Sequence, residues 1–161
     1  MADQTDALPC AFTRRSFVLH ACEAASLAAL GSMLQSCSSS PTSPSSTAPS
    51  LPVINGTTAN GVVSVTIDPA SSLANVGGAA LVQASSAVLL VARTAQSSFT
   101  ALTAICTHEG CTITGFQSPM YVCPCHGSQY STSGSVLNGP ATQPLRQFAT
   151  QFANNVLTIS T

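Results

Sequence analysis

Two short runs in the C-terminal half of the chain, each with cysteine and histidine at metal-binding spacing, constrain the fold more than any other feature. The first begins at Cys106 and reads Cys-Thr-His-Glu-Gly-Cys, and the second begins at Cys123 and reads Cys-Pro-Cys-His-Gly-Ser. Thiolates and imidazoles are donors that hold zinc and iron–sulfur centres. We therefore expect two loops that converge on one metal centre, with four candidate ligands: Cys106, His108, Cys123 and His126.

Two thiolates and two imidazoles suit two kinds of centre. A structural zinc uses the same ligand types in a tetrahedral site. A 2Fe-2S centre uses them when two histidines replace two cysteines on one of its irons. Each run also carries one further cysteine, Cys111 or Cys125, and no other cysteine follows Cys37. A zinc site leaves the placement of these two cysteines unexplained, so we favour the iron–sulfur centre.

The two runs resemble the ligand boxes of Rieske 2Fe-2S proteins, in particular the disulfide-bearing branch found in cytochrome bc- and bf-type complexes. The resemblance covers roughly residues 60–161. It implies that Cys106 and Cys123 bind one iron, whereas His108 and His126 bind the other. It also implies the Rieske fold and a function in one-electron transfer.

The resemblance assigns roles to residues around the ligands as well. It implies a disulfide between Cys111 and Cys125, which makes the two loops rigid. It implies that the hydroxyls of Ser128 and Tyr130 donate to the cluster and to a cysteine sulfur, and such bonds raise the reduction potential. We therefore predict a potential in the upper half of the window of roughly −150 to +300 mV. The Pro-containing segment 139–145 is expected to cover the cluster.

The N-terminal residues predict export. Arg14 and Arg15 lie in Thr-Arg-Arg-Ser-Phe and precede the apolar stretch 24–34, an arrangement that resembles a twin-arginine signal over residues 1–36. The sequence Leu-Gln-Ser-Cys that ends at Cys37 resembles a lipoprotein box, so we predict lipid attachment there. A retained anchor helix is the alternative, although a bilayer span needs roughly 20 apolar residues, more than this stretch provides.

Composition separates a linker from a folded domain. Residues 37–52 consist mainly of Ser, Pro and Thr and cannot form a core, so we predict a lipid-attached linker. Residues 53–161 have the length of one domain. We therefore predict a Rieske domain tethered in the bacterial periplasm, at the outer face of the cytoplasmic membrane.

Strand signals recur at short spacing along the domain, and no helix-period stripe of useful length follows residue 51. Pairs such as Asn154-Asn155 tolerate the positive φ that hairpin turns need. We predict an all-β domain of stacked antiparallel sheets, with the two ligand boxes as loops at one tip. The predicted strands are 62–67, 79–83, 87–93, 99–105, 120–123 and 156–159.

The domain is almost uncharged. Beyond Cys37 the charged residues are Asp68, Arg93, Glu109 and Arg146, and the chain has no lysine. This composition excludes electrostatic nucleic-acid binding, which needs clustered Lys and Arg. Glu109 stands where quinol-oxidising members of the resembling family usually carry Leu, and a carboxylate suits an apolar quinol pocket poorly.

These features predict one-electron transfer to a redox partner protein, such as a cytochrome or an oxidoreductase subunit, by a membrane-tethered carrier. One alternative is the Rieske subunit of a bc-type quinol–cytochrome c reductase. Another is the small subunit of an arsenite-oxidase-like molybdenum enzyme. Beyond Cys37 there is no further histidine and no pair of carboxylates, so we expect no catalysis from the domain alone.

Overall fold

A computed structural model describes residues 48–161. The predicted export signal with Arg14 and Arg15, the lipid site Cys37 and most of the predicted linker lie outside the described residues. Within residues 48–161 every regular element is a β-strand, which confirms the all-β prediction. No helix in this part of the chain is long and apolar enough to cross a membrane.

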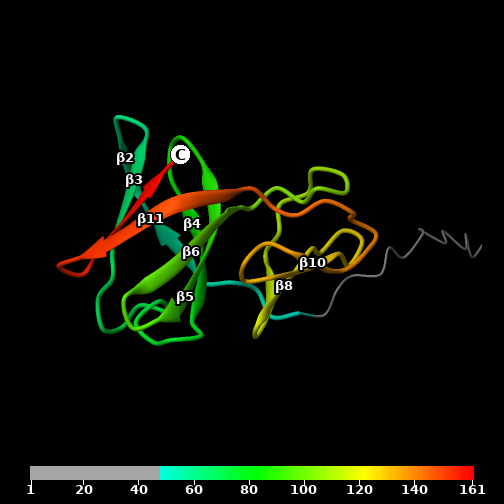
Figure 1. Cartoon of the computed structure of the whole chain (residues 1–161), viewed down its shortest axis with the longest axis horizontal. Helices are drawn as coiled ribbons and strands as arrows, with labels where there is room; N and C mark the ends of the chain where they lie inside the picture. The colour runs from blue at the N-terminus through cyan, green and yellow to red at the C-terminus, as the bar shows by residue number, and fades with distance from the viewer. Residues whose placement is uncertain (1–47) are drawn as a thin grey trace, which may run out of the picture. The chain divides into compact units, whose positions relative to one another are not determined.

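In the described part, twelve strands form two sheets of unequal size (Figure 1). The large sheet has the order β1 (Val53–Asn55), β4 (Ala79–Gln83), β5 (Val88–Ala95), β6 (Ser98–Thr103), β11 (Gln147–Ala153), β12 (Val156–Ser160), β3 (Val62–Thr66) and β2 (Thr57–Ala59). The small sheet has the order β10 (Val136–Asn138), β9 (Gln129–Ser131), β8 (Met120–Val122) and β7 (Gly115–Gln117). The six predicted strands correspond to β3, β4, β5, β6, β8 and β12, with bounds that agree to within two residues.

Strands β4, β5 and β6 form the centre of the domain because they are apolar on both faces. In β5, Leu89 and Val91 pack with the apolar interior of the large sheet, whereas Leu90 and Ala92 pack toward the small sheet. All four side chains are at most 2% exposed. A near-continuous apolar run such as Val-Leu-Leu-Val-Ala is what burial on two faces requires. The two hydrophobic cores therefore share one layer of strands.

The large sheet curls until its two edge strands meet at one residue. β1 and β2 lie at opposite ends of the strand order, yet only Gly56 separates them in the chain. The Gly56 N–H donates to the Gln83 carbonyl at 2.8 Å. A Cβ at this position would lie 2.8 Å from Cγ1 of Val63 and 3.2 Å from Cγ1 of Val82. Glycine is therefore required where the chain passes over the apolar interior from one edge to the other.

The residues just before β1 belong to the fold. The Leu51 N–H donates to the Thr114 carbonyl at 2.7 Å, and the Phe116 N–H donates to the Pro49 carbonyl at 2.8 Å. Leu51 is 5% exposed and packs into the core that faces the small sheet. Leu51, which lies within the predicted linker 37–52, thus supplies an apolar side chain that the core buries.

The last hairpin follows the predicted turn chemistry. β11 and β12 pair in antiparallel fashion and are joined by Asn154 and Asn155, whose φ angles are 50° and 60°. Asparagine tolerates this left-handed region better than most other residues with a side chain. β11 also pairs with β6, so it continues the large sheet directly after the segment 139–145 has left the small sheet.

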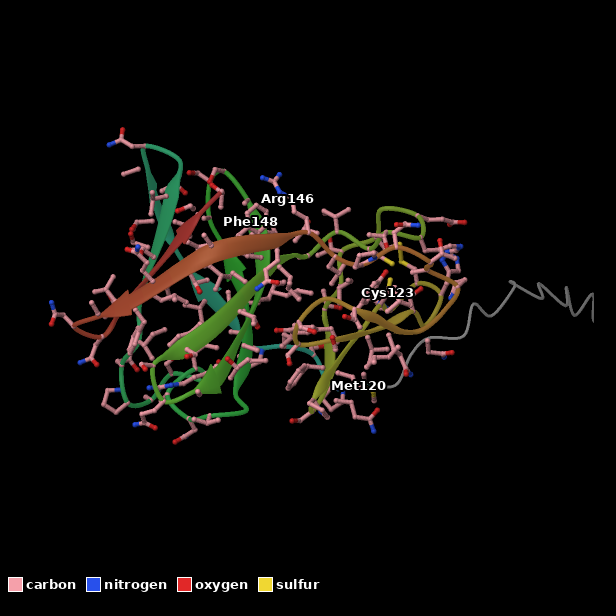
Figure 2. The ribbon with its side chains drawn as sticks, viewed as in Figure 1. Met120, Cys123, Arg146 and Phe148 are labelled. Atoms are coloured by element: carbon pink, nitrogen blue, oxygen red, sulfur yellow. A yellow bond between two sulfur atoms is a disulfide. The ribbon has the colours of Figure 1, made fainter. Side chains whose placement is uncertain are left out.

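The two arginines of the domain lie in opposite environments. Arg146, just before β11, is exposed, and its guanidinium carbon lies 4.6 Å from the centre of the Phe148 ring (Figure 2). Arg93, in β5, is only 8% exposed. Its guanidinium carbon lies 5.2 Å from the ring centre of Phe99 and 5.5 Å from that of Phe152. The exposed arginine contributes surface charge, whereas the buried one belongs to the large sheet.

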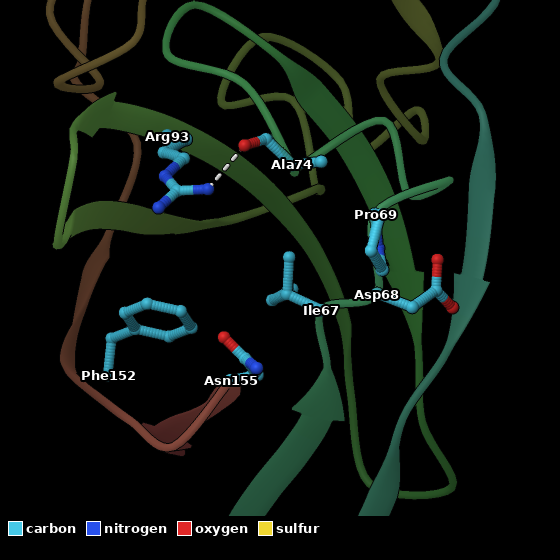
Figure 3. Close-up of a pocket in the computed structure, with 7 residues that line it drawn as sticks. All are labelled: Ile67, Asp68, Pro69, Ala74, Arg93, Phe152 and Asn155. Atoms are coloured by element: carbon cyan, nitrogen blue, oxygen red, sulfur yellow. Dashed lines mark hydrogen bonds between the residues drawn. The ribbon is translucent and has the colours of Figure 1, made fainter.

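Backbone carbonyls satisfy the buried Arg93 side chain. One terminal nitrogen donates to the Ala74 carbonyl at 2.5 Å (Figure 3) and to the Leu73 carbonyl at 3.3 Å. The Nε atom donates to the Gln96 carbonyl at 3.1 Å. Because an unpaired buried charge is costly, these bonds explain how the sheet tolerates the guanidinium. Arg93 therefore ties the loop after β3 to the turn between β5 and β6, and it lines a hollow together with Asp68 (Figure 3).

Candidate metal centre

Both cysteine–histidine runs lie in loops that the small sheet brings together. The first run lies between β6 and β7, and the second lies between β8 and β9. β7 and β8 form an antiparallel pair in which Gly115, at the start of β7, is opposite Val122, at the end of β8. The loop that leads into Gly115 and the loop that leaves Val122 therefore meet at one end of this pair, as predicted.

The two loops share one pattern of backbone hydrogen bonds. In the first, the Cys106 N–H donates to the Cys111 carbonyl at 2.8 Å, and the Gly110 N–H donates to the Cys106 carbonyl at 2.9 Å. The second loop repeats both bonds at 2.8 and 3.0 Å, from the N–H groups of Cys123 and Gly127. Both glycines have a φ of 75°, which residues with a Cβ rarely adopt. The two glycines therefore allow the tight turns beside the candidate ligands.

A disulfide joins the two loops. It links Cys111 to Cys125 across a Cα–Cα distance of 6.5 Å. The pairing that the resemblance implies is therefore confirmed. A crosslink between two loops restricts the ways in which they can separate, so it holds the candidate ligands of one loop against those of the other.

The other two cysteines of the described residues are free and buried. Cys106 is 3% exposed and Cys123, which Figure 2 labels, is 1% exposed. Burial raises the pKa of the Cys106 thiol, but hydrogen bonds from Tyr130, the His108 backbone, Cys123 and Ser128 outweigh it, so the pKa lies below its usual value. Burial raises the pKa of Cys123, and its neighbour Cys106 raises it further. The two pKa values are thus shifted in opposite directions, and a bound cation would stabilise two thiolates side by side.

The two histidines lie close together and are more exposed than the two thiols. The His108 and His126 ring centres are 5.0 Å apart, with the ring planes at 85°. Their side chains are 27% and 39% exposed. Nδ1 of His108 is buried and has no hydrogen-bond partner among the described residues. An unpaired buried ring nitrogen calls for an explanation, and coordination to a metal supplies one.

Glu109 places its carboxylate near one ring nitrogen of each imidazole. Oε1 lies 3.8 Å from Nε2 of His108, and Oε2 lies 3.7 Å from Nδ1 of His126. The Glu109 side chain is 60% exposed. The sequence marked this residue as unusual, but its position between the two rings follows only from the convergence of the loops.

The Tyr130 hydroxyl lies 3.3 Å from Sγ of Cys106, as predicted for a sulfur donor. The same oxygen accepts the Thr107 N–H at 3.2 Å and lies 2.9 Å from the Thr107 hydroxyl. That hydroxyl donates to the Gln143 carbonyl at 2.7 Å, so Tyr130 shares its single proton between Thr107 and the sulfur. Burial raises the pKa of Tyr130, and the neighbouring Cys106 adds to the effect. The tyrosine therefore remains a protonated donor.

Thr107 is a contributor that the sequence did not reveal. It lies between two candidate ligands, and nothing in its local sequence distinguishes it from a solvated loop residue. Its hydroxyl donates a hydrogen bond to the carbonyl of Gln143, which is 36 residues further along the chain. Only the fold brings the two together.

The segment 139–145 packs across both loops. Oγ of Ser128 is fully buried and accepts the Ala141 N–H at 3.0 Å, and Gln143 accepts from Thr107 of the other loop. Ala141 and Leu145 are each 4% exposed. Since the Ala141 bond occupies a lone pair of Ser128, the serine proton is free to point toward Cys106, in line with its lowering of that thiol's pKa.

The residues present fit a 2Fe-2S cluster. The site contains two buried free thiols and a buried imidazole nitrogen that has no hydrogen-bond partner among the described residues. A hydroxyl donor lies beside one of the sulfurs, and this set of groups suits a metal centre. Sulfur atoms of Cys111 and Cys125 lie within 4.8 Å of the Cys123 sulfur, but their disulfide excludes them as thiolate ligands. Two cysteines and two histidines remain, and this is the ligand set in which His₂ replaces Cys₂ on one iron.

Comparison with known proteins gives a match of the same kind. Residues 64–149 match the family model described as "Rieske [2Fe-2S] domain". The cytochrome b6-f complex iron-sulfur subunit of Chlorobaculum thiosulfatiphilum is 37% identical over 62 residues, which cover 38% of this chain and 34% of that protein. The subunit of the same name from Prochlorococcus marinus (strain AS9601) is 54% identical over 41 residues, which cover 25% of this chain and 23% of that protein. The chain thus spans about a third or less of these curated relatives.

Solved structures are similar over a larger share of the chain. The cyanobacterial plasma membrane Rieske protein from Synechocystis PCC 6803 aligns with a TM-score of 0.44 and 25% identity, over 63% of this chain and 87% of that one. A chain of a hyperthermophilic respiratory Complex III aligns with a TM-score of 0.44 and 27% identity, over 52% of this chain and 66% of that one.

Proposed function

This chain belongs to the Rieske [2Fe-2S] family, and on that premise we propose that it carries single electrons with a high-potential cluster in an exported, membrane-tethered protein. Family membership gives the cofactor and the class of function. The proposal adds the ligands, the setting of the potential and the location. Cys106 and Cys123 would hold one iron, and His108 and His126 would hold the other.

One observation carries the proposal: two buried free thiols and two imidazoles from separate loops meet beside a disulfide. When bound, the cluster supplies a one-electron couple. The thiols hold it on the side that faces the core, where water is excluded. The partly exposed rings of His108 and His126 connect the site to the surface, so electrons would enter and leave on their side.

The hydroxyl contacts support a high potential. Tyr130 and Ser128 both direct hydrogen-bonding groups at Cys106. A hydrogen bond to a ligand sulfur stabilises the reduced, more negative form of a centre more than the oxidised form, so it raises the potential. Neutral imidazoles in place of thiolates act in the same direction because they remove negative charge.

The N-terminal sequence supports export and tethering. Arg14 and Arg15 before an apolar stretch direct a protein to a translocation route, and a cysteine at the end of that stretch suits lipid attachment. The proposal therefore expects lipid on Cys37. Replacing Cys37 by Ala should release the exported protein from the membrane fraction, and a variant that stays membrane-bound would argue for a retained anchor.

A second candidate function is that of an iron–sulfur subunit in a quinol-oxidising cytochrome complex. The names of the curated relatives favour it. Glu109 disfavours it, because its exposed carboxylate stands beside the imidazoles that an apolar quinol pocket would enclose. Copurification with a b-type cytochrome from native membranes would support the complex, whereas a chain that solubilises alone would support the free carrier.

Metal analysis and voltammetry of the purified chain test the proposal. We expect iron and labile sulfide in equal amounts, no zinc, and a potential in the upper half of the window of roughly −150 to +300 mV. Stoichiometric zinc would contradict the cofactor, and a potential well below zero would contradict the proposed role of the hydroxyl contacts.

A further inference from the structure

Glu109 is the only charged residue in the two ligand loops and in the segment 139–145 that crosses them. Of the other charges in the described domain, Arg93 is buried in the large sheet, and Asp68 lines the same hollow as Arg93 (Figure 3). Arg146 follows the segment and lies over the Phe148 ring. The charge at the exposed end of the site is therefore set by one carboxylate.

This carboxylate lies where electrons are expected to pass. Its two oxygens are 3.8 and 3.7 Å from the nearest nitrogens of His108 and His126. In the described residues these two rings are the only basic side chains within 4.0 Å of the carboxylate, and no Lys or Arg neutralises it. Because Glu109 is 60% exposed, a molecule that approaches the two imidazoles must meet a negative charge.

From this geometry we propose that Glu109 selects a redox partner protein whose docking face presents a Lys or Arg side chain to the His108–His126 edge. The inference rests on the proposed function, in which electrons leave through that edge. A cation opposite Glu109 would complete the ion pair that the domain itself lacks. An apolar or acidic partner would have to bury the carboxylate unpaired, which is costly.

The expected size of the effect follows from Coulomb's law. A unit charge about 6 Å away in water changes an encounter about threefold, and a trivalent ion whose centre stays about 10 Å away changes it about eightfold before screening. Salt at about 0.15 M screens over roughly 8 Å, so the effect should shrink as ionic strength rises. Charge selectivity that disappears in salt is therefore the signature of this residue.

Stopped-flow oxidation of the reduced full chain tests the proposal with two probes of opposite charge. The probes are tris(phenanthroline)cobalt(III), a trivalent cation, and hexacyanoferrate(III), a trivalent anion. At low ionic strength, Glu109→Gln should slow the cobalt reaction about five- to tenfold and accelerate the hexacyanoferrate reaction by a similar factor. Asp68→Asn is the matched control, since it removes the same charge and keeps the oxygen that accepts the Ala70 N–H. It should change either rate less than twofold.

The opposite signs separate electrostatic selection from a change in driving force. If Glu109→Gln merely raised the reduction potential, both oxidants would react more slowly, and this result would overturn the proposal. Equal effects of Glu109→Gln and Asp68→Asn would also overturn it, because they would show a dependence on net charge alone.

A protein probe extends the test to docking. Reduction of a basic c-type cytochrome by the wild-type chain should slow as salt rises, and Glu109→Gln should lower the rate at low salt and flatten that dependence. A rate that is independent of salt would contradict a cationic partner and fit an uncharged one. The failure of this proposal can be distinguished from the failure of the proposed function. A purified chain without an iron–sulfur signal would refute the function. An intact cluster whose oxidation rates do not depend on the charge of the oxidant would refute only the selection by Glu109.

Discussion

The large sheet and the ligand loops of this domain are held together in different ways. In the large sheet, β4, β5 and β6 bury apolar side chains on both faces, and even the buried arginine is satisfied by backbone carbonyls. The loops have few apolar side chains of their own. A disulfide, paired backbone hydrogen bonds and three hydroxyl groups, those of Thr107, Ser128 and Tyr130, hold them in place.

The contrast suggests that the large sheet determines the stability of the fold, whereas the ligand loops adjust the reduction potential of the cluster. The free energy gained by burying apolar side chains is proportional to the buried area and does not depend on direction. The sheet can therefore stabilise the fold without influencing the cluster. Hydrogen bonds are directional and act on individual atoms, so the loops can adjust the charge on one sulfur at little cost to the fold. Substitutions in the two regions should therefore affect different observables.

The largest effect is expected at a ligand. Cys123→Ser should abolish the cluster, since a hydroxyl replaces the thiolate proposed to bind iron, while the large sheet keeps its structure. Visible absorbance and far-UV circular dichroism of the purified variant measure the two outcomes. Retention of the full visible spectrum would remove Cys123 from the ligand set, and a collapsed β-sheet signal would show that the two regions are not independent.

A cavity in the large sheet should have the opposite profile. Leu89 is 1% exposed and packs in the core away from the loops. Leu89→Ala should lower the free energy of unfolding by about 2–5 kcal/mol, because a buried side chain of this size leaves a cavity. Urea unfolding measures this loss, and voltammetry should find an unchanged potential. A shifted potential would break the proposed separation.

Removal of the disulfide should loosen the loops alone. The double variant Cys111→Ser/Cys125→Ser should lose about 2–4 kcal/mol of stability, with the effect confined to the small sheet and its loops. Hydrogen exchange should show faster amides in residues 104–114 and 123–128, whereas β4 and β5 keep their protection. Equal acceleration in both regions would mean that the disulfide stabilises the whole domain.

The smallest predicted effect separates two buried tyrosines. Tyr130→Phe should lower the reduction potential by about 20–60 mV, which corresponds to one hydrogen bond of roughly 0.5–1.5 kcal/mol at 59 mV per tenfold change. Tyr121→Phe is the matched control, because the Tyr121 hydroxyl is buried without a hydrogen-bond partner among residues 48–161 and Tyr121 is opposite Tyr130 in the small sheet. Its potential should stay unchanged. Similar shifts in both variants would point to packing rather than to the bond with sulfur.

Strands with strong sequence signals were predictable. β3, β4, β5 and β12 have β-branched or continuous apolar residues, and burial on one or both faces explains these patterns. β7, β9 and β10 have three residues each and include Gly, Gln, Ser and Asn, which carry little strand preference. They are strands because neighbouring segments supply their hydrogen bonds. β11 has alternate half-buried residues, but its Gln and Ala residues hide this pattern.

The candidate site was predictable where chemistry is encoded locally. Spacing and residue type identify the four candidate ligands, and the disulfide and the contact of Tyr130 with a cysteine sulfur are observed where the resemblance implies them. The role of Thr107 and the position of Glu109 between two rings depend on contacts between loops. Those contacts arise because β7 pairs with β8 and because segment 139–145 packs across both loops. No local sequence pattern predicts them.

The central claim is that two thiols and two imidazoles from these loops hold one 2Fe-2S cluster. Pulsed electron paramagnetic resonance of the chemically reduced full chain tests it most directly, because nitrogen nuclei bound to iron couple strongly to the unpaired electron. We predict two strongly coupled ¹⁴N nuclei in the wild-type protein and the loss of this spectrum in His108→Ala and His126→Ala. A reduced cluster without strongly coupled nitrogen would contradict the claim, and so would a spectrum that survives either substitution.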